Sequence, residues 1–548
     1  MRRRRARALG CSLVGAVLLT ACTPTSEPPA QPTPPSPAPP AMTSSRAPAP
    51  VTLPKGNPQL TDVIPAPVRV EQAPQQNFPL DETTAIVAPE EPRAARAASD
   101  AAGLLRETLR RSTRYELPDT PRGQVIALEL ADSGDLPPQG YRLEVTRTRV
   151  TLTGADRAGL LNGVQTLLQL LPPEVVAGKR PRGDLVIAGG VITDYPRFRY
   201  RGTMLDVARH FFDAETVKRH IDRIARYKIN HLHLHLSDDQ GWRLEIRKWP
   251  NLTRVGGRTQ VGGGRGGWFS QRDYTSIVRY AQRRGVTIVP EFDMPGHTQA
   301  ALAAYPELSC DGKARSPYTG TQVGFSTLCV EKPKTYEFVR DVIEEVAELT
   351  PGPYLHIGGD EAQSTKPQAY RRFIGEVLPM VLEAGKRPIG WHEYAEADLP
   401  KEAVVQYWRL ERAHAATAAA ARSGNRVVMS PADKTYIDMK YFESDARGNK
   451  WAGPVSVQTA YDWDPARYLA GVGEQAILGV EAPLWTELVE TEADIERQAF
   501  PRLAAIAEVG WTPQKDRNWQ DFRKRLAKHG PRLEALGIAF HRSPDVPW

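Results

Sequence analysis

Near the middle of the chain the sequence reads His231-Leu232-His233-Leu234-His235-Leu236. Strict alternation of polar and apolar side chains is typical of a β-strand, because successive side chains of a strand point to opposite faces. A helical pattern precedes it, in which Val217, Ile221 and Ile224 share one face behind Asp213, a candidate N-cap. The region therefore predicts a helix followed by a strand, the unit from which α/β folds are built.

Short apolar runs of this kind recur along the second part of the chain, separated by stretches with helical spacing. In one of these stretches Phe338, Val342 and Val346 share a face, and Ser270 or Asp273 is a candidate cap for another. The predicted strands are residues 200–206, 229–236, 286–292, 354–357, 387–391, 403–408, 426–429 and 476–480. Eight β/α units in about 350 residues predict an α/β fold, a (β/α)8 TIM barrel whose parallel sheet closes on itself.

The chain ahead of this barrel mixes strand-like and helical patterns without a regular alternation. The strand-like runs are 124–130 and 141–153, and the helical ones are 93–111 and 155–171. They predict a smaller α+β domain over residues 56–195, followed by the barrel over residues 196–548. All eleven tryptophans lie from Trp242 onward, so stacking on a ring-shaped ligand is expected in the barrel.

Composition and charge exclude one class of partner. The 548 residues are 41% hydrophobic and 25% charged, as in folded globular proteins. The formal net charge is +7, but five arginines among the first seven residues leave only +2 for the chain from Cys22 onward. We therefore expect no nucleic-acid partner, because such binding rests on concentrated positive charge.

The N-terminus predicts export. Residues 1–21 combine arginines with a short apolar stretch, as a signal peptide does, and the ending Leu19-Thr20-Ala21-Cys22 resembles a bacterial lipobox, which implies a lipidated Cys22. Residues 22–55 are rich in proline and predict an extended tether. We expect a lipoprotein of the cell envelope, bound to the membrane through its lipid anchor only; the alternative is a secreted protein with an ordinary signal peptide.

Two cysteines remain after the signal and the lipid site are set aside. In an oxidising compartment Cys310 and Cys329 are expected to form a disulfide. The loop that they close has about 20 residues, for which loop entropy gives roughly 3 kcal/mol of stabilisation. Two cysteines at this spacing are too few for a metal site.

The alternating histidines at 231, 233 and 235 allow two interpretations. Histidines two apart on a barrel strand occur as metal ligands in hydrolases. The interpretation that we favour is hydrogen-bonded polar filling of the barrel, with no metal. A chelator would distinguish the two, since only a metal-dependent hydrolase would lose its activity.

The glycine-rich stretch 261–267 contains a formal G-x-G-x-x-G pattern. Dinucleotide binding requires this pattern between a strand and a helix of a compact βαβ unit, and neither surrounds it here. We interpret it as a flexible loop near the pocket and expect no cofactor.

Polar residues follow each predicted strand, where barrel active sites lie. Their convergence predicts one pocket at the carboxyl end of the barrel. These residues are Arg209, Asp238, Asp239, Asp293, His297, Asp360, Glu361, Trp391, His392, Glu393, Trp408, Tyr436, Asp438, Trp485 and Glu487.

The pair Asp360-Glu361 follows two glycines, Gly358 and Gly359, which allow a ligand to approach the backbone closely. Adjacent residues diverge in direction, so this pair cannot supply an acid and a nucleophile on opposite sides of one bond. Some other group must attack.

Five motifs follow one another along the chain: Arg201-Gly-Thr-Met-Leu-Asp-Val-Ala-Arg209-His, the run from His231 to Trp242, Glu291-Phe-Asp293-Met-Pro-Gly-His297, His356-Ile-Gly-Gly-Asp360-Glu361 and Trp485-Thr-Glu487. With these motifs the chain resembles, from about residue 56 onward, the family 20 glycoside hydrolases, the β-N-acetylhexosaminidases. The resemblance implies an α+β domain, a catalytic barrel and retaining hydrolysis in which the 2-acetamido oxygen of the substrate is the nucleophile.

The resemblance also implies a role for each site residue. Glu361 would be the general acid and base, and Asp360 would orient and polarise the acetamido N–H. Asp238, His297 and Asp293 would support Glu361. The substrate-binding residues would be Arg209, Trp391, Trp408, Tyr436, Asp438, Trp463, Trp485 and Glu487, with Trp463 at the pocket rim.

These roles predict an exo-acting enzyme that releases terminal non-reducing β-linked N-acetylglucosamine or N-acetylgalactosamine from an oligosaccharide or glycoconjugate. The alternative is a carbohydrate-binding surface lipoprotein on a non-catalytic barrel. Such a protein would keep the tryptophans but would not need Asp360 and Glu361, and both are present.

Overall fold

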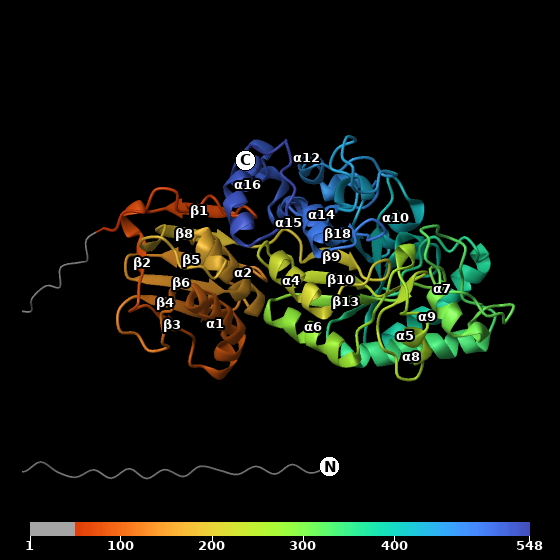
Figure 1. Ribbon diagram of the computed structural model, residues 1–548. Helices are drawn as coiled ribbons and strands as arrows, with labels where there is room; N and C mark the ends of the chain where they lie inside the picture. The colour runs from red at the N-terminus through yellow and green to blue at the C-terminus, as the bar shows by residue number, and fades with distance from the viewer. Residues whose placement is uncertain (1–49) are drawn as a thin grey trace, which may run out of the picture. The chain divides into compact units, whose positions relative to one another are not determined.

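The computed structural model describes residues 50–548 (Figure 1). The predicted export signal, Cys22 and most of the predicted tether lie outside the described residues. Within residues 50–548 no helix combines the length and the hydrophobicity needed to cross a membrane.

A six-stranded sheet forms the core of the first domain, with strand order β1-β8-β5-β6-β4-β3. Its strands are β1 (Arg69–Gln72), β3 (Ala85–Val87), β4 (Val125–Leu130), β5 (Tyr141–Val145), β6 (Arg149–Gly154) and β8 (Gly190–Asp194). Helices α1 (Pro92–Thr113) and α2 (Arg157–Gln169) pack on each other and on the sheet, and α3 (Pro173–Val176) contacts α1. A separate pair, β2 (Phe78–Leu80) and β7 (Leu185–Ile187), completes the domain.

The strand-like run 141–153 contains a turn. Its residues form the antiparallel hairpin of β5 and β6. Thr146 closes the turn, since its N–H and its hydroxyl both donate to the carbonyl of Arg149, at 2.8 Å each. The polar–apolar alternation continues across the turn, so periodicity alone did not reveal it.

Eight parallel strands close into the predicted (β/α)8 barrel. They are β9 (Tyr200–Asp206), β10 (His231–His235), β13 (Thr287–Glu291), β14 (Tyr354–His356), β15 (Arg387–Trp391), β16 (Val404–Tyr407), β17 (Arg426–Met429) and β18 (Ile477–Leu484). All eight predicted strands are present, and β18 runs four residues beyond its predicted end. The fold class is therefore confirmed.

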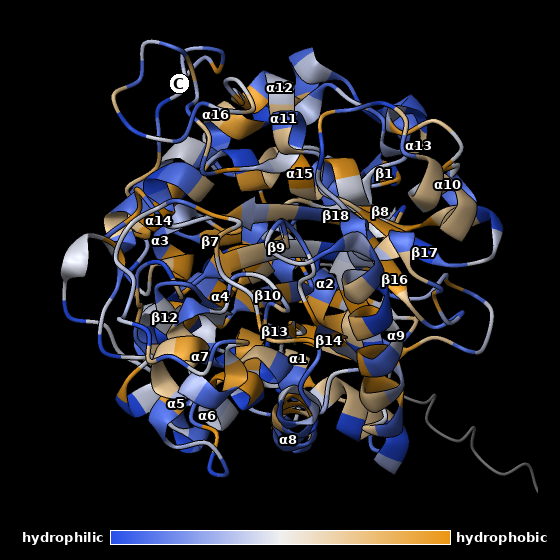
Figure 2. Ribbon diagram, turned by 90° about the vertical axis from the view of Figure 1, so that its right-hand side faces the viewer, coloured by the Kyte–Doolittle hydropathy of each residue, from blue (hydrophilic) through white to orange (hydrophobic). Residues whose placement is uncertain are grey.

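Helices surround the barrel, and Figure 2 shows hydrophobic residues on the strands and hydrophilic ones on the outer sides of the helices. The main helices are α4 (Ala214–Ala225), α6 (Gln271–Arg283), α8 (Pro333–Leu349), α9 (Pro367–Glu383), α10 (Ala415–Arg422), α14 (Glu492–Ala499), α15 (Arg502–Trp511) and α16 (Trp519–Ala535). Shorter ones are α5 (Asn251–Arg254), α7 (Gln299–Ala304), α11 (Ala432–Thr435), α12 (Val457–Tyr461) and α13 (Pro465–Tyr468). A small hairpin joins β11 (Ser237–Asp238) to β12 (Gly241–Trp242).

The predicted helix starts are found in the structure. The Asp213 side chain accepts the N–H of Thr216 at 2.8 Å, and Ser270 and Asp273 form a reciprocal capping box at the start of α6. Each such cap contributes about 1 kcal/mol. The caps fix where these helices begin relative to the strand ends that carry the site.

Asp194, at the end of β8, joins the first domain to the barrel. Its carboxylate accepts from Trp511 Nε1 at 2.8 Å and from Lys228 Nζ at 3.1 Å, and both partners belong to the barrel. Trp511 is itself part of the hydrophobic cluster of the first domain. The two domains therefore share buried contacts.

The interior of the barrel changes character along its axis. Near the start of the strands it is filled by an aromatic and aliphatic cluster that includes Tyr200, Val289 and Tyr354. Closer to the carboxyl ends of the strands, the interior is filled by fully buried polar side chains, among them His233 and Glu291. This polar layer lies directly beneath the site.

Candidate active site

A cleft of about 660 Å³ opens at the carboxyl end of the barrel. Residues from the loops after six of the eight strands meet there, as the pattern predicted. The predicted site residues that line it are Arg209, Asp360, Glu361, Trp408, Tyr436, Asp438, Trp485 and Glu487. The structure thus brings together positions nearly 280 residues apart in the sequence.

The loop after β14 holds Asp360 and Glu361 in an unusual backbone conformation. Glu361 has φ +48°, in the left-handed region that non-glycine residues rarely adopt. Gly358 has φ +67°, and a Cβ there would lie 1.8 Å from Asp293 Oδ1, so only glycine fits. Such strained residues cluster at functional sites.

His297 joins the two adjacent carboxylates. Its Nε2 atom lies 3.5 Å from Glu361 Oε2 and 3.6 Å from Asp360 Oδ2. Since both carboxylates approach the same nitrogen, they lie on the same side of the cleft. The Glu361 side chain is 26% exposed and the Asp360 side chain 10%, so both can be reached from the cleft.

Asp238 supports His297 from below. Its Oδ1 lies 3.2 Å from His297 Nδ1, and its Oδ2 lies 2.8 Å from Arg209 Nη2 and from His235 Nε2. Burial opposes ionisation here, but the charges of Arg209 and His297 hold the pKa of Asp238 well below its ordinary value. Asp238 is therefore a permanent anion that keeps His297 protonated, and the pKa of His297 is raised well above its usual range despite burial.

Asp293 supports the loop rather than the cleft. Its Oδ1 accepts the N–H of Gly359 at 2.9 Å. Burial, and after it the charge of Asp360, raises the pKa of Asp293 well above its ordinary value. A protonated Asp293 can donate a hydrogen bond to Asp360, so the two buried carboxyl groups need not repel each other.

Aromatic rings form the walls of the cleft. Trp408 stacks near Tyr436 with ring centroids 6.4 Å apart, and Trp485 lies 6.4 Å from Tyr436. Trp391 is 1% exposed and lies behind Trp485, with centroids 5.8 Å apart. Burial, and then the charge of Asp360, raises the pKa of Tyr436 well above its usual range, so its hydroxyl stays a hydrogen-bond donor.

Carboxylates and Arg209 occupy another part of the cleft. The Arg209 guanidinium lies over the Trp485 ring at 4.7 Å, and Asp438 accepts from Asn449 Nδ2 at 3.0 Å. Burial, and then the charge of Glu487, raises the pKa of Asp438 to about 7. This mixture of anionic and cationic groups can bind the hydroxyls of a sugar.

The structure does not place Trp463 at the pocket rim. Its ring is largely buried, donates from Nε1 to the Ala460 carbonyl at 3.1 Å and packs edge-on against Tyr468. Trp451 lines the cleft instead; it is 51% exposed and stands nearly perpendicular to Trp408. Sequence reasoning missed Trp451 because no expected strand end lies beside it.

Other cleft residues were also missed. Asn449 lies 3.5 Å from Glu487, and Leu410 and Leu488 line the mouth although they are exposed and apolar. Val323 and Thr321 come from the loop closed by Cys310 and Cys329.

Cys310 and Cys329 form the predicted disulfide, with Cα atoms 4.7 Å apart. Gly262 donates to the Thr319 carbonyl at 2.9 Å, so the glycine-rich loop lies against the same segment.

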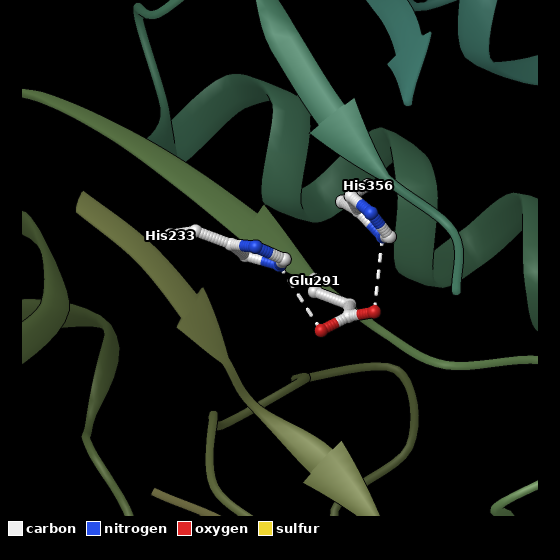
Figure 3. A group of neighbouring side chains, drawn as sticks. All are labelled: His233, Glu291 and His356. Carbon is white, nitrogen blue, oxygen red and sulfur yellow. Dashed lines mark ion pairs between the residues drawn. The ribbon is translucent and has the colours of Figure 1, made fainter. Parts of the chain in front are cut away.

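Histidines and carboxylates group beneath the cleft, and Figure 3 shows His233, Glu291 and His356. His233 lies between Glu291 at 3.0 Å and Glu481 at 2.9 Å. Although burial lowers its pKa, the two carboxylates raise it to about 9. A protonated imidazole cannot ligate a metal, which favours hydrogen-bonded filling of the barrel for His233.

Comparisons with known proteins agree with this geometry. Residues 198–514 match the model for the glycosyl hydrolase family 20 catalytic domain, and residues 60–195 match the model for domain 2 of the same family. A β-N-acetylhexosaminidase from Cellulomonas fimi is 39% identical over 486 residues, which cover 89% of this chain and 97% of the relative.

Solved structures are similar over the same range. The family 20 β-N-acetylhexosaminidase from Streptomyces coelicolor A3(2) matches with 49% identity and a TM-score of 0.86, covering 90% of this chain and 99% of its own. A mutant Streptomyces plicatus β-hexosaminidase in complex with its product, GlcNAc, matches with the same identity, TM-score and coverage.

Proposed function

The chain belongs to glycosyl hydrolase family 20 and is a β-N-acetylhexosaminidase, and we propose that Glu361 and Asp360 carry out its reaction, in which the substrate supplies the nucleophile. The enzyme removes terminal non-reducing β-linked N-acetylhexosamine, and the configuration at the anomeric carbon is retained. The observation that carries the proposed mechanism is the position of both carboxylates against one nitrogen of His297.

Two carboxylates on one side of a cleft cannot flank a glycosidic bond. A retaining enzyme with a protein nucleophile holds its two carboxyl groups about 5–5.5 Å apart on opposite sides of the bond. Here the second reacting group is the 2-acetamido oxygen of the substrate, which attacks the anomeric carbon. The C1–oxygen bond to the leaving group breaks, and a cyclic oxazolinium intermediate forms.

Glu361 donates a proton to the leaving oxygen and then takes one from the water that opens the intermediate. Its partial exposure places it within reach of both, and His297 holds it in place from below. Asp360 accepts a hydrogen bond from the acetamido N–H, which gains positive charge as the ring closes. Tyr436 donates to the acetamido oxygen and aligns it for attack.

Binding of the sugar uses the rest of the cleft. The rings of Trp408 and Trp485 enclose the acetamido methyl group and the apolar face of the sugar, and Trp391 packs behind Trp485. Arg209, Asp438 and Glu487 bind its hydroxyls. No cofactor is needed for any of these steps.

A panel of nitrophenyl glycosides tests this function. We expect cleavage of the β-N-acetylglucosaminide and the β-N-acetylgalactosaminide, and natural oligosaccharides then rank the linkages. Binding without turnover of any acetamido substrate would favour the alternative, a carbohydrate-binding protein on a non-catalytic barrel.

We also propose that the enzyme is exported and held at the cell envelope through lipidated Cys22. The support is the lipobox-like ending of the apolar N-terminal stretch, followed directly by a proline-rich segment. A tether of this kind extends by roughly 3 Å per residue, so it could carry the barrel several nanometres from a membrane. Secretion without an anchor is the alternative.

A further inference from the structure

A row of buried side chains runs beneath the cleft, and carboxylates and imidazoles alternate along it. Its members are Glu481, His233, Glu291, His235, Asp238 and His297, and each side chain is at most 2% exposed. Distances between successive partners are 2.9 Å for Glu481 and His233, 3.0 Å for His233 and Glu291, 2.8 Å for His235 and Asp238, and 3.2 Å for Asp238 and His297. The remaining link is the hydrogen bond between His235 Nδ1 and Glu291 Oε2.

Glu291 is the point at which this row branches. Strand pairing places it in register with His235 on β10 and with His356 on β14. Its Oε2 faces both His233 and His235, whereas its Oε1 accepts from Trp391 Nε1 at 2.8 Å. His356 Nδ1 lies 2.9 Å from the same Oε1 (Figure 3). One carboxylate therefore contacts both Trp391, which packs behind the cleft residue Trp485, and His235, which contacts Asp238.

The charges along the row alternate in sign. Burial lowers the pKa of His235, but Glu291 and Asp238 outweigh it and raise the pKa to about 10. Burial likewise opposes ionisation of Glu291, but the surrounding imidazoles, His235 first, hold its pKa well below the ordinary value. Glu291 interacts with groups on several elements, which are His233 and His235 on β10, His356 on β14, Trp391 on β15, and Asp293 and Asp360 on the loops above. Glu481 on β18 contacts His233.

We propose that Glu291 is a positioning residue for hydrolysis, which orients Glu361 through the imidazole–carboxylate row and orients the acetamido pocket through Trp391. This inference rests on the proposed function of Glu361 and Trp391. Glu291 touches neither substrate nor the reacting atoms. It acts by fixing the ring orientation and the charge of His235, which in turn holds Asp238 against His297.

The physical reason is the cost of unpaired buried charge. Without the Glu291 anion, His233 and His235 would be two buried imidazoliums with one carboxylate partner each instead of two, an arrangement that burial opposes. At least one of them must lose its proton. When that imidazole is His235, Asp238 loses a cationic partner.

The test compares Glu291→Gln, Glu291→Asp and a matched control, Thr203→Val. Thr203 is another fully buried polar side chain of the barrel strands, and its hydroxyl donates to the Ala482 carbonyl rather than to the row. We expect Glu291→Gln to lower kcat by about 10- to 100-fold, the loss typical of removing an outer partner of an active-site group. Thr203→Val should stay within about twofold of the wild type.

The pH profile separates positioning from a merely structural effect. In Glu291→Gln, His235 keeps one carboxylate instead of two, so its pKa falls and a new ionisation enters the profile of kcat/KM on the alkaline side. Glu291→Asp restores the negative charge and should return the profile toward that of the wild type, even though its side chain is shorter. A folded Glu291→Gln enzyme with wild-type kcat/KM and an unchanged profile would overturn the proposal.

Imidazole ¹⁵N NMR gives a readout that needs no turnover. In the wild type at pH 8, the rings of His233 and His235, assigned by single histidine replacements, should both be protonated. Neutral rings there would overturn the proposal even if no Glu291 variant folds. The proposed function fails separately. If both rings are protonated in the wild type but the enzyme cleaves no acetamido glycoside, the proposed function is refuted, whereas the alternating charges of the imidazole–carboxylate row are confirmed.

Discussion

His297 Nε2 lies 3.5 Å from Glu361 Oε2, and the opposite ring nitrogen of His297 lies 3.2 Å from Asp238 Oδ1. His297 itself has φ +54°, so its backbone, like that of Glu361, is held in the left-handed region. A histidine that bridges a permanent anion and an exposed carboxyl group orients that group without blocking the cleft. Asp360 lies at a similar distance from the same nitrogen, but its side chain is 10% exposed against 26% for Glu361, so Glu361 is the better placed of the two for proton transfer to a leaving group.

Glu361→Gln should nearly abolish hydrolysis and leave the fold intact. General acid–base assistance is typically worth about 10²- to 10⁴-fold, and glutamine cannot donate the proton. A nitrophenolate leaves without protonation, so the loss should be larger for natural oligosaccharides. Steady-state rates on both substrate types measure this, with the exposed helical variant Glu348→Gln as control. An equal loss on both types would argue against Glu361 as the acid.

Trp451 and Trp463 form a matched pair that tests the corrected pocket rim. Trp451→Ala removes an exposed ring of the cleft and should raise KM for oligosaccharides more than for small aryl glycosides, without lowering the melting temperature. Trp463→Ala removes a buried ring and should cost about 3–5 kcal/mol of stability, with KM unchanged in the folded enzyme. Steady-state kinetics and calorimetry of both variants measure these effects. A raised KM for Trp463→Ala together with an unchanged KM for Trp451→Ala would place Trp463, and not Trp451, at the pocket rim.

Asp438→Asn should make stability less dependent on pH. Burial and the charge of Glu487 raise the pKa of Asp438 from 3.8 to about 7. Between these values the folded state keeps a proton that the unfolded chain releases, so wild-type stability falls as pH rises through the window, by at most about 4 kcal/mol. The variant should therefore melt at a higher temperature than the wild type at pH 8 but not at pH 4. A difference that is the same at both pH values, measured by calorimetry, would contradict this.

Cys22→Ala should release the enzyme from the membrane fraction, because a lipid anchor needs the cysteine thiol. Fractionation of cells that express the wild type and the variant, followed by activity assays on each fraction, measures the change. Cys11→Ala serves as the control, since it also removes a cysteine of the N-terminal segment but leaves the lipobox-like ending intact. If the Cys22→Ala variant still sediments with membranes as the wild type does, the prediction of a lipid anchor at Cys22 is wrong.

The barrel was predictable because its signals are local. Alternation at His231–Leu236 and the other short apolar runs identified all eight strands, and the caps at Asp213 and Ser270 follow from hydrogen bonding within one turn. The β18 extension was not predictable, because Glu481 resembles a surface residue in sequence. Its burial is possible because Tyr200 and His233, which are far from it in the sequence, hydrogen-bond to its carboxylate.

The site was predictable to the extent that its residues follow strands. Asp360, Glu361, Tyr436 and Trp485 come directly after barrel strands or one short helix beyond them, so topology alone placed them. Trp451 lies in a long connection after β17, whose path depends on packing against other loops. The partners of Glu291 were not predictable either, because His235 and His356 face it only through the register of neighbouring strands, which the sequence does not show.

The acetamido group of the substrate should be indispensable, since Asp360 and Glu361 approach the same nitrogen of His297 and so cannot stand on opposite sides of one glycosidic bond. A β-glucoside with a plain 2-hydroxyl offers no carbonyl oxygen to attack the anomeric carbon, and it leaves Tyr436 without its partner. Intramolecular displacement followed by attack of water inverts the anomeric carbon twice, so the first product should be the β anomer. Asp360→Asn should lower turnover far more than it weakens sugar binding, because Asp360 acts mainly as charge develops on the acetamido nitrogen. A stable thiazoline mimic of the cyclic intermediate should inhibit strongly. Proton NMR of the early product, with N-acetylglucosaminide and glucoside compared, is the deciding measurement: the α anomer appearing first, or equal cleavage of the glucoside, would refute attack by the substrate.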